Sequence, residues 1–332
     1  MLIWPQTMAH RFCLALLLLA VFGRPAQSAD CGPLKILSTV QMQPLGRGPL
    51  MLVPVRVNSV RENFLLDTGG SVSQLIPVAA NDLRLSAEPA KIRLYDIYGN
   101  SAARQTMVER FDVGNLEARS LALWIAPSRS GDDYRRDFFP PPRWRPRHGM
   151  DGVLAPDLMS NYDVELDFGS NTLKYLSQDH CAGQVVYWNA GIAAVVPMQF
   201  RNLQITVPVE LDGHALTALI DTGSPRSTMN LDVAQSVFGL APGAGLNRAG
   251  TLGMTGQPFY TTRMRQMSFE GVEVDNPVLD VIPDLMHPSA QAANTSNPLA
   301  LPQLLIGMDV LSKLHLYFAF REKRIYITEA AR

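Results

Sequence analysis

The tripeptide Asp-Thr-Gly occurs twice in this chain, each time directly after an apolar run. The first copy spans residues 67–69 within NFLLDTGGS, and the second spans residues 221–223 at the end of HALTALIDTGS. A single copy would indicate no more than a turn, because Asp and Gly are ordinary turn residues. Two copies in matching contexts indicate that the chain contains a duplicated unit.

The similarity between the two halves extends beyond the tripeptide. The offset that aligns the two copies (221 − 67 = 154) also places Ser73 on Ser227. Further along, GVLAPDLMSNYDVELDF aligns with LLIGMDVLSKLHLYFAF at an offset of 152 (304 − 152), which places Asp157 on Asp309. Two offsets this similar indicate one ancestral unit that was duplicated.

Length and composition agree with two folded lobes. The chain has 332 residues, and a single hydrophobic core stops growing at about 250–300 residues. It is 47% hydrophobic and 18% charged with a net charge of −1, so it lacks the basic surface that nucleic-acid binding requires. We predict a first lobe over residues 29–180, a linker over 181–193 and a second lobe over 194–332.

The N-terminus has the pattern of a signal peptide. Arg11 precedes the apolar run 12–22, which is far shorter than the roughly 20 residues that span a bilayer. Small residues at Ala26 and Ser28 predict cleavage that removes residues 1–28. We therefore expect an exported protein, periplasmic or secreted, with no membrane attachment after processing. A retained membrane anchor is the alternative.

Export bears on the cysteines. Cys13 leaves with the signal peptide, and Cys31 and Cys181 remain as an even pair, which predicts a disulfide in an oxidising compartment. Two buried free thiols are the alternative. Asp30 disfavours a lipid anchor on Cys31, because lipoprotein signals carry a small residue there. The histidines are scattered and none are spaced four apart as in a helical ligand pair, so no metal site is predicted.

Both tripeptides are expected where a strand ends in a loop. Two β-rich runs meet at Asn58-Ser59 and lead into Asp67, and two more meet at Asp212-Gly213 and lead into Asp221. A second hairpin is expected in each lobe, over residues 92–108 and 249–264.

Each lobe should close with two strands, DVELDF and TLKYL in the first and LHLYFAF and RIYIT in the second. Helix is expected only after each tripeptide and in the turns DLMSN and DVLSK. The irregular insertions 127–149 and 283–302 are predicted to be mobile surface loops. Contact of the first loop with substrate, through Trp144 and its arginines, is the alternative.

Two lobes related by a pseudo-two-fold axis would bring Asp67 and Asp221 together. Carboxylates about 3 Å apart cannot both ionise, so such a pair holds one proton and titrates as a unit. It offers a base and an acid in one site, which suits hydrolysis of a peptide bond without metal or cofactor.

The flanking residues of the two tripeptides suit such a pair. Gly69 and Gly223 would let the backbone pass close to it. Thr68 and Thr222 would hydrogen-bond across the lobe interface and hold both loops rigid.

These motifs resemble those of the pepsin and retropepsin superfamily of aspartic proteases, in the single-chain, two-lobed form of exported bacterial members. The resemblance rests on the segments 65–69 and 219–223 and on the later Leu305-Ile306-Gly307, and it covers residues 35–328. It implies an all-β fold of two homologous barrel lobes with an active-site cleft between them. It also implies endopeptidase activity on a peptide or protein substrate and hairpin flaps over the site. The internal duplication makes a homodimer unnecessary, so a monomer is expected.

The resemblance places a flap tyrosine near the tip of the first-lobe hairpin. Tyr95 and Tyr98 are both available there, and Tyr98 beside Gly99 is the preferred candidate. A tyrosine packed in an ordinary hairpin is the alternative.

The chain departs from the family pattern in its first lobe. Ala155, followed by Pro156, stands where the second lobe has the supporting Gly307. The residue after the tripeptide is Gly70 in the first lobe and Ser224 in the second. A hydroxyl that donates to a carboxylate lowers its pKa, so we expect Ser224 to leave the charge on Asp221 and the proton on Asp67.

Two classes of function are compatible with these patterns. The leading one is an exported aspartic endopeptidase that uses Asp67 and Asp221. The other is a catalytically weak or silent peptide-binding module of the cell envelope on the same fold, for which Ala155 and the long insertions speak.

Overall fold

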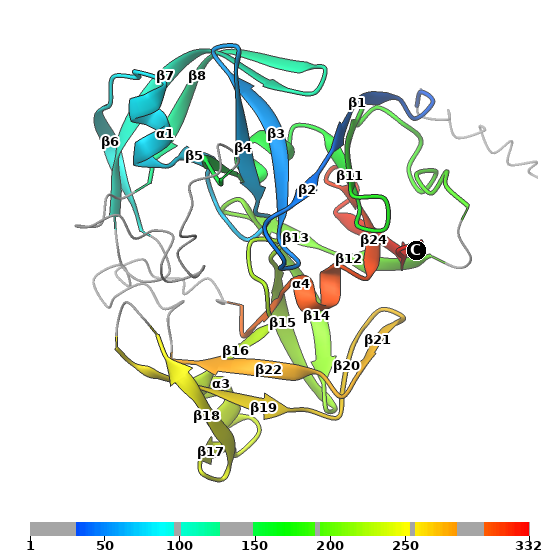
Figure 1. Cartoon of the computed structure of the whole chain (residues 1–332). Coiled ribbons are helices and arrows are strands. Elements are labelled where there is room, and N and C mark those ends of the chain that lie inside the picture. Colours follow the sequence, from blue (N-terminus) through cyan, green and yellow to red (C-terminus); the bar gives the residue numbers. More distant parts are fainter. Residues whose placement is uncertain are drawn as a thin grey trace, which may run out of the picture. The chain divides into compact units, whose positions relative to one another are not determined.

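The computed structural model describes residues 31–95, 101–126, 149–189, 193–252, 256–283 and 302–331. The chain divides into two compact units, Met1–Cys31 and Gly32–Arg332, and the helices and strands of the described residues all lie in the second. That unit is mostly β and has two lobes (Figure 1). Among the described residues, no helix is long and apolar enough to cross a membrane.

The strands of the first half are β1 Ile36–Gln41, β2 Gln43–Pro44, β3 Met51–Val57, β4 Val60–Leu66, β5 Gln74–Leu75, β6 Glu88–Tyr95, β7 Ser101–Val113, β8 Leu116–Ile125, β9 Gly152–Leu154, β10 Asp163–Asp167 and β11 Thr172–Leu176. Its helices are α1 Pro77–Asp82 and α2 Pro156–Met159.

The strands of the second half are β12 Ala194–Pro197, β13 Gln199–Arg201, β14 Gln204–Leu211, β15 His214–Ile220, β16 Thr228–Asn230, β17 Ala241–Pro242, β18 Gly245–Thr251, β19 Pro258–Arg263, β20 Gln266–Phe269, β21 Val272–Asp275, β22 Val278–Ile282, β23 Leu304–Ile306, β24 Leu314–Ala319 and β25 Arg324–Glu329. Its helices are α3 Leu231–Ser236 and α4 Met308–Leu311.

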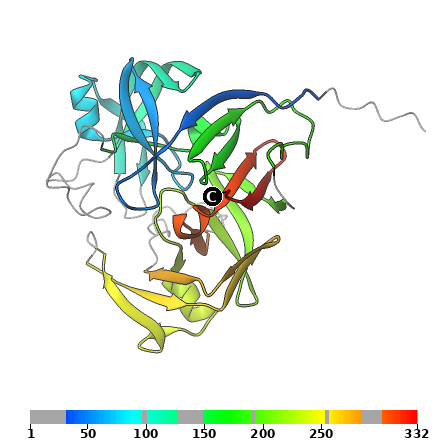
Figure 2. The same ribbon diagram turned by 45° about the vertical axis from the view of Figure 1, so that its right-hand side comes forward.

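The two lobes repeat one topology, which confirms the predicted duplication. In the first lobe the strand order is β2-β3-β4-β9-β5-β8-β7-β6, and an additional β3–β7 pairing closes the sheet on itself. The parallel pair β4–β9 corresponds to β15–β23 in the second lobe, and the antiparallel pair β5–β9 corresponds to β16–β23. Figures 1 and 2 show the two lobes on opposite sides of the unit.

The predicted hairpins and helices are present. β3 and β4 turn at Asn58 and Ser59, and β14 and β15 turn at Asp212 and Gly213, all four residues having positive φ. Two positive φ angles in a two-residue loop match the right-handed twist of the strands. β6 pairs with β7, and β18 with β19, as the second hairpins. The short helices α2 and α4 occupy the predicted turns.

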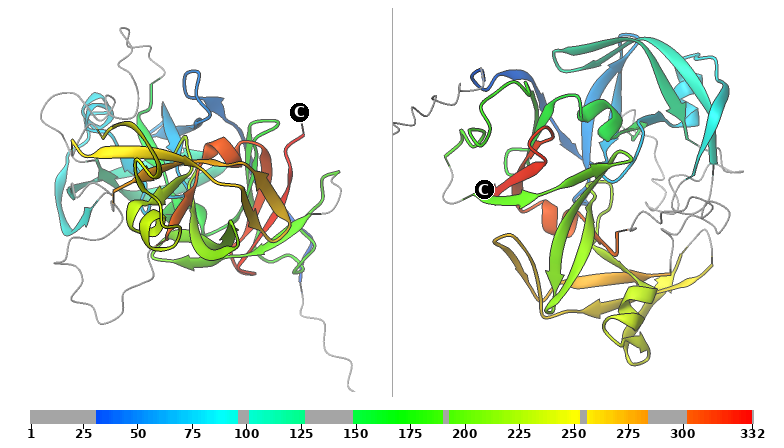
Figure 3. Two further views of the ribbon diagram at one scale, coloured as in Figure 1. Left: turned by 90° about the horizontal axis from the view of Figure 1, so that it is seen from below. Right: turned by 180° about the vertical axis from the view of Figure 1, so that it is seen from behind.

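The closing strands of both lobes form one shared sheet. Its order is β1-β11-β10-β24-β25-β12, so β10 of the first half pairs directly with β24 of the second. This six-stranded sheet lies beside the two lobes in Figure 1 and in both views of Figure 3. The sequence predicted the four closing strands but not that they pair across the lobes, because strand patterns carry no information on distant partners.

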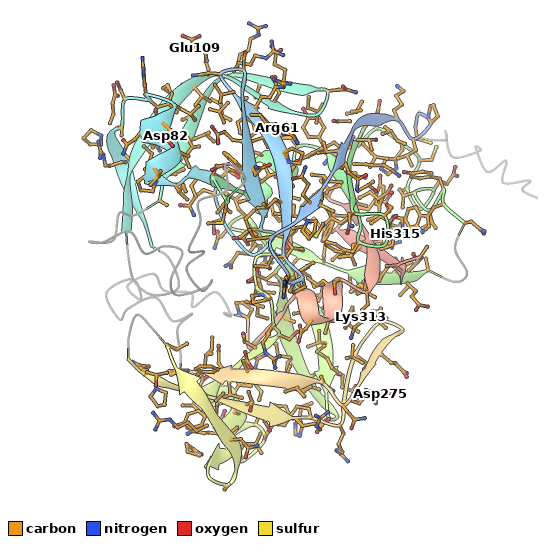
Figure 4. All side chains as sticks on the ribbon, viewed as in Figure 1. Arg61, Asp82, Glu109, Asp275, Lys313 and His315 are labelled. Atoms are coloured by element: carbon orange, nitrogen blue, oxygen red, sulfur yellow. The ribbon has the colours of Figure 1, made fainter. Side chains whose placement is uncertain are left out.

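A buried charged cluster lies inside the six-stranded sheet. Glu165 on β10 accepts hydrogen bonds from Lys174 Nζ (2.8 Å) and Tyr187 Oη, and it contacts His315 Nε2 on β24 at 3.1 Å. Trp188 of the linker stacks on the His315 ring with centroids 4.1 Å apart. Figure 4 shows His315 among the packed side chains of this sheet. Burial alone would raise the pKa of Glu165, but these hydrogen bonds outweigh it and lower the pKa.

A second carboxylate, Asp163, sits two residues earlier on the same face of β10. Its Oδ2 contacts His180 Nε2 at 2.6 Å and accepts a hydrogen bond from Tyr317 Oη at 3.1 Å. The Phe320 N–H donates to Oδ1. The two carboxylates of the first half therefore bond to side chains of the second, which ties the halves together.

We expect the substitution Glu165→Gln to destabilise the protein by about 3 kcal/mol at pH 7, because it leaves Lys174 partly buried without its charge partner. Since folding lowers the pKa of Glu165, its stabilising effect is present above the unfolded pKa of about 4.3 and is lost as the pH falls through the folded value. The difference in the free energy of unfolding between the variant and the unsubstituted protein should therefore become smaller towards pH 3. Urea unfolding across this range measures it.

The exposed Glu109, labelled in Figure 4, provides the matched control. Glu109→Gln should change the free energy of unfolding by no more than about 0.5 kcal/mol at any pH. A gap for Glu165→Gln that does not depend on pH would contradict the charge-based explanation.

Candidate active site

Each Asp-Thr-Gly loop begins where a buried strand ends. β4 delivers Asp67, whose N–H donates to the Leu154 carbonyl of β9 at 3.0 Å. β15 delivers Asp221, whose N–H donates to the Ile306 carbonyl of β23, also at 3.0 Å. In both lobes, the parallel neighbour strand thus fixes the backbone of the aspartate.

The two loops pack against each other without room for a side chain on either glycine. A Cβ added to Gly69 would lie 2.4 Å from Cγ of Asp221, and one added to Gly223 would lie 2.5 Å from Cγ of Asp67. Real Cβ atoms essentially never lie within 3 Å of a non-bonded heavy atom, so both positions require glycine. The structure thus brings the predicted pair of aspartates together, one from each lobe.

The threonines form the predicted hydrogen bonds across the interface. The Thr68 N–H donates to Thr222 Oγ1 at 3.0 Å, and the Thr222 N–H donates to Thr68 Oγ1 at 3.1 Å. Each hydroxyl then donates to the strand that precedes the opposite tripeptide, Thr68 to the Ile220 carbonyl and Thr222 to the Leu66 carbonyl. Both threonines are almost completely buried, so all four bonds are shielded from water.

The two carboxyl groups lie close enough to influence each other's ionisation, and burial raises the pKa of both. For Asp67, this rise is offset by N–H groups of Gly70 (2.7 Å) and Gly69 (3.1 Å), which both donate to Oδ1. For Asp221, the negative charge of Asp67 adds to the effect of burial, and its pKa lies well above the ordinary value. The pair therefore shares one proton and titrates as a unit.

The structure removes the basis of the expectation from the sequence, which placed the charge on Asp221; which of the two carboxyls holds the proton stays a prediction. That expectation relied on a hydrogen bond from the hydroxyl of Ser224. In the structure, Ser224 Oγ donates to the Arg226 carbonyl at 3.0 Å. Asp221 instead accepts the N–H groups of Gly223, at 2.8 Å, and of Ser224. The serine side chain turns back on its own loop because the carbonyl two residues further along is within reach of its hydroxyl.

Ala155 is accommodated in its position. Its backbone is extended (φ −116°, ψ 172°), which any residue can adopt. At Gly307, by contrast, an added Cβ would lie 2.5 Å from the Arg226 carbonyl. A Cβ built on the facing Gly70 would lie 3.5 Å from the Ala155 Cβ, an ordinary contact distance, so the methyl group is not crowded by that loop. The alanine therefore does not by itself distort the loop below Asp67.

A hydrogen-bonded support under each loop was not assigned from the sequence. Ser73 donates to Asp157 through both N–H and hydroxyl, and Ser227 donates to Asp309 in the same way. The signal was available, because both pairs occupy matching positions in the repeat. It was missed because neither residue type has a fixed role outside a known fold.

The remaining predicted residues divide between those the structure describes and those it does not. Cys31 and Cys181 are disulfide-bonded, which confirms that prediction. The flap candidates Tyr98 and Gly99 lie outside the described residues, as do Trp144 and nearly all of both insertions. Within the described ranges, no cluster of three or more His, Cys, Asp or Glu side chains is suited to a metal ion.

We expect Thr68→Val and Thr222→Val each to lower the free energy of unfolding by about 2–4 kcal/mol. Each change removes one hydroxyl and leaves a buried N–H and a buried carbonyl without a partner, at about 1–3 kcal/mol for each group. Because the two networks mirror each other, the two losses should agree within about 1 kcal/mol. Urea unfolding tests this, with the exposed Thr39→Val as a control that should stay near zero.

The substitution Asp221→Asn should raise the melting temperature at pH 7 by at least about 2 °C. Folding raises the pKa of both carboxyls, so their contribution to stability is present below the unfolded pKa of about 3.9 and is lost as the pH rises through the folded values. Asparagine is neutral at every pH, so the substituted protein does not have to take up a proton at this position in order to fold. The gain in melting temperature should vanish near pH 3. The control Asp275→Asn, at an exposed site, should show no gain. An equal gain at pH 7 and pH 3 would contradict this account.

Comparison with known proteins identifies the family. The sequence model described as aspartyl protease matches residues 53–138 and 207–310, which together exceed half of the chain and each include one Asp-Thr-Gly. Among solved structures, basic 7S globulin from soybean aligns with a TM-score of 0.46 and 10% identity, over 89% of this chain and 95% of that one. No curated protein matches in sequence. The chain belongs to the aspartyl protease family, in a two-lobed all-β form.

Proposed function

We propose that this chain is an aspartic endopeptidase that hydrolyses peptide bonds with a water molecule activated between Asp67 and Asp221. The observation that carries the proposal is the pair itself, one buried carboxyl from each lobe, brought together where the two loops interlock. Such a pair supplies a general base and a general acid within one site.

The proposed reaction uses only the two carboxyls and water. The Asp67 carboxylate takes a proton from the attacking water as its oxygen bonds to the carbonyl carbon, and Asp221 gives its proton to the carbonyl oxygen. In the resulting gem-diol, Asp67 then passes its proton to the nitrogen. One hydroxyl of the diol returns a proton to Asp221 as the C–N bond breaks. The products are a carboxylic acid and an amine, and the pair regains its starting state.

The surroundings support this use of the pair. The N–H groups of Gly69 and Gly70 stabilise negative charge on Asp67, as a base that must stay ionised requires. The cross-lobe threonine bonds fix the separation of the two carboxyls before substrate arrives, which preorganises the site.

We further propose an extended peptide or protein as substrate, with Tyr98 and Gly99 in a flap over the cleft. The disulfide supports an exported protein, because disulfides persist in oxidising compartments. The two lobes of one chain supply both aspartates, so a monomer suffices for activity.

The test is cleavage of a diverse peptide library between pH 3 and 8 by the protein without residues 1–28. Asp67→Asn and Asp221→Asn should each lower kcat by about 10²–10⁴-fold or more, because each removes one partner of the proton transfers. A statine-type inhibitor should block the unsubstituted protein. Asp275→Asn, an exposed aspartate at the edge of the second lobe in Figure 4, is the matched control and should retain full activity.

The outcome separates the two candidate functions. Cleavage that both substitutions abolish establishes the enzyme. Cleavage that persists in both points to a contaminating protease and overturns the proposal. A folded protein that binds peptides but cleaves none at any pH would instead be the silent binding module, for which the alanine at position 155 was the sequence argument.

A further inference from the structure

We propose that Asp157 is a positioning residue for the catalytic loop of the first lobe, and that its counterpart Asp309 matters less because the second lobe has additional ties. The inference rests on the proposed function of the Asp67–Asp221 pair. It concerns the loops 67–73 and 221–227, which begin at the catalytic aspartates.

The two lobes share one support. Asp157 accepts the Ser73 hydroxyl at 2.6 Å and the Ser73 N–H at 2.9 Å, and Ser73 Oγ in turn accepts the Ala155 N–H at 3.0 Å. This joins the far end of the first loop to the junction of β9 and α2.

In the second lobe, Asp309 accepts the Ser227 hydroxyl at 2.7 Å and its N–H at 2.9 Å, and Ser227 Oγ accepts the Gly307 N–H at 3.0 Å. The support thus repeats almost bond for bond, at the junction of β23 and α4.

The second lobe also holds its loop in the middle. The Met308 N–H donates to the Ser224 carbonyl at 2.9 Å, and the Ser224 hydroxyl donates to the Arg226 carbonyl at 3.0 Å. Gly307 packs directly against the Arg226 carbonyl. Three contacts therefore fix the second loop between its two ends.

The first lobe cannot form the corresponding ties. The residue aligned with Met308 is Pro156, which has no N–H to donate. The residue aligned with Ser224 is Gly70, which has no hydroxyl. Across the described part of the first lobe, no hydrogen bond joins the Gly70 carbonyl to the β9–α2 junction. Among the described residues, the hydrogen bonds that hold the first loop to its own lobe after Gly70 all involve Ser73, which bonds to Asp157, to the Ala155 N–H and to the Trp124 N–H.

This difference bears on the charged partner of the pair. The Gly70 N–H, at 2.7 Å, is the shorter of the two backbone bonds to Asp67 Oδ1. Its direction depends on where the chain between Thr68 and Ser73 lies, and Asp157 holds the end of that segment. Asp157 should therefore act on the ionisation of Asp67 through the loop without touching substrate.

The experiment compares Asp157→Asn with Asp309→Asn in the protein that carries the disulfide. Asparagine keeps the size of the side chain but leaves one acceptor oxygen for the N–H and hydroxyl of Ser73 or Ser227, with an NH₂ group in place of the other oxygen. We expect kcat to fall at least about tenfold in Asp157→Asn and less than about threefold in Asp309→Asn, with KM little changed in both, since small misplacements of reacting groups are costly. An equal fall in kcat in the two variants, or a change in KM without a fall in kcat, would overturn the proposal.

The pH profile separates positioning from general loosening of the fold. In Asp157→Asn, the acid limb should move to higher pH, because Asp67 loses part of the N–H donation that keeps it ionised. The titratable group that faces Asp67 is Asp221, which neither substitution touches. The ionisable side chain near Asp157 is Tyr175, whose burial raises its pKa out of the working range. An unmoved acid limb would count against the role.

A second substitution in the first lobe should restore part of the lost activity. Adding Pro156→Ala to Asp157→Asn supplies the N–H that Met308 has in the second lobe and lets it reach the Gly70 carbonyl. We expect kcat to recover at least about threefold. No recovery in a folded double variant would refute the idea that the missing middle tie makes the first loop depend on Asp157.

Two further measurements keep the proposal testable in every case. If Asp157→Asn fails to fold, Ser73→Ala and Ser227→Ala replace the pair of aspartate variants. We then expect kcat to fall more in Ser73→Ala than in Ser227→Ala. If the unsubstituted protein cleaves nothing, the proposed function fails. Carbon-13 NMR titration of Asp67 then still decides the positioning role: its pKa should rise in Asp157→Asn but not in Asp309→Asn, and an equal response would refute it.

Discussion

The interlocking of the two Asp-Thr-Gly loops is the contact on which the rest of this molecule depends. Each tripeptide glycine presses on the aspartate of the other lobe at a distance that excludes even a methyl group. The buried threonines then make four hydrogen bonds across the same interface, two to each other and two to backbone carbonyls of the opposite lobe. Such a contact tolerates almost no relative shift of the lobes, because a packed interior without voids cannot deform gradually. Everything outside the loops must therefore hold the two halves in one register.

The shared six-stranded sheet meets that requirement. A one-residue slip between β10 and β24 would turn Glu165 and Asp163 to the opposite face and away from His315 and Tyr317. Each carboxylate would then be buried without its partners, which costs several kcal/mol. Buried ion pairs add little net stability compared with apolar packing. Their effect here is to specify register, and thereby the separation of Asp67 and Asp221 some distance away.

The sequence predicted the parts of the fold that local strings encode. The duplicated tripeptides, the turn residues at Asn58-Ser59 and Asp212-Gly213, and the apolar runs before each aspartate predicted the hairpins and the pairing of the loops. The sequence did not predict that the closing strands join across the lobes, since strand partners are chosen by the whole fold. It also predicted a hydrogen bond from the Ser224 hydroxyl to Asp221, which the structure does not contain. The direction of the Ser224 hydroxyl depends on a carbonyl two residues along, and the balance of charge depends on burial, neither of which a motif displays.

The two halves have diverged in a coupled way around this fixed contact. Where the second lobe combines Ser224 with Gly307, the first combines Gly70 with Ala155, so one small side chain has moved from the loop to the junction beneath it. The exchange is not one of packing partners, because Gly307 is limited by the backbone carbonyls of Arg226 and Ser224. It does not conserve hydrogen bonds, because the proline after Ala155 removes a donor that Met308 retains. A symmetric dyad thus rests on two unequal supports. The lobe with fewer ties carries the aspartate that must remain charged, and that ionisation depends on backbone N–H groups whose positions the loop alone determines.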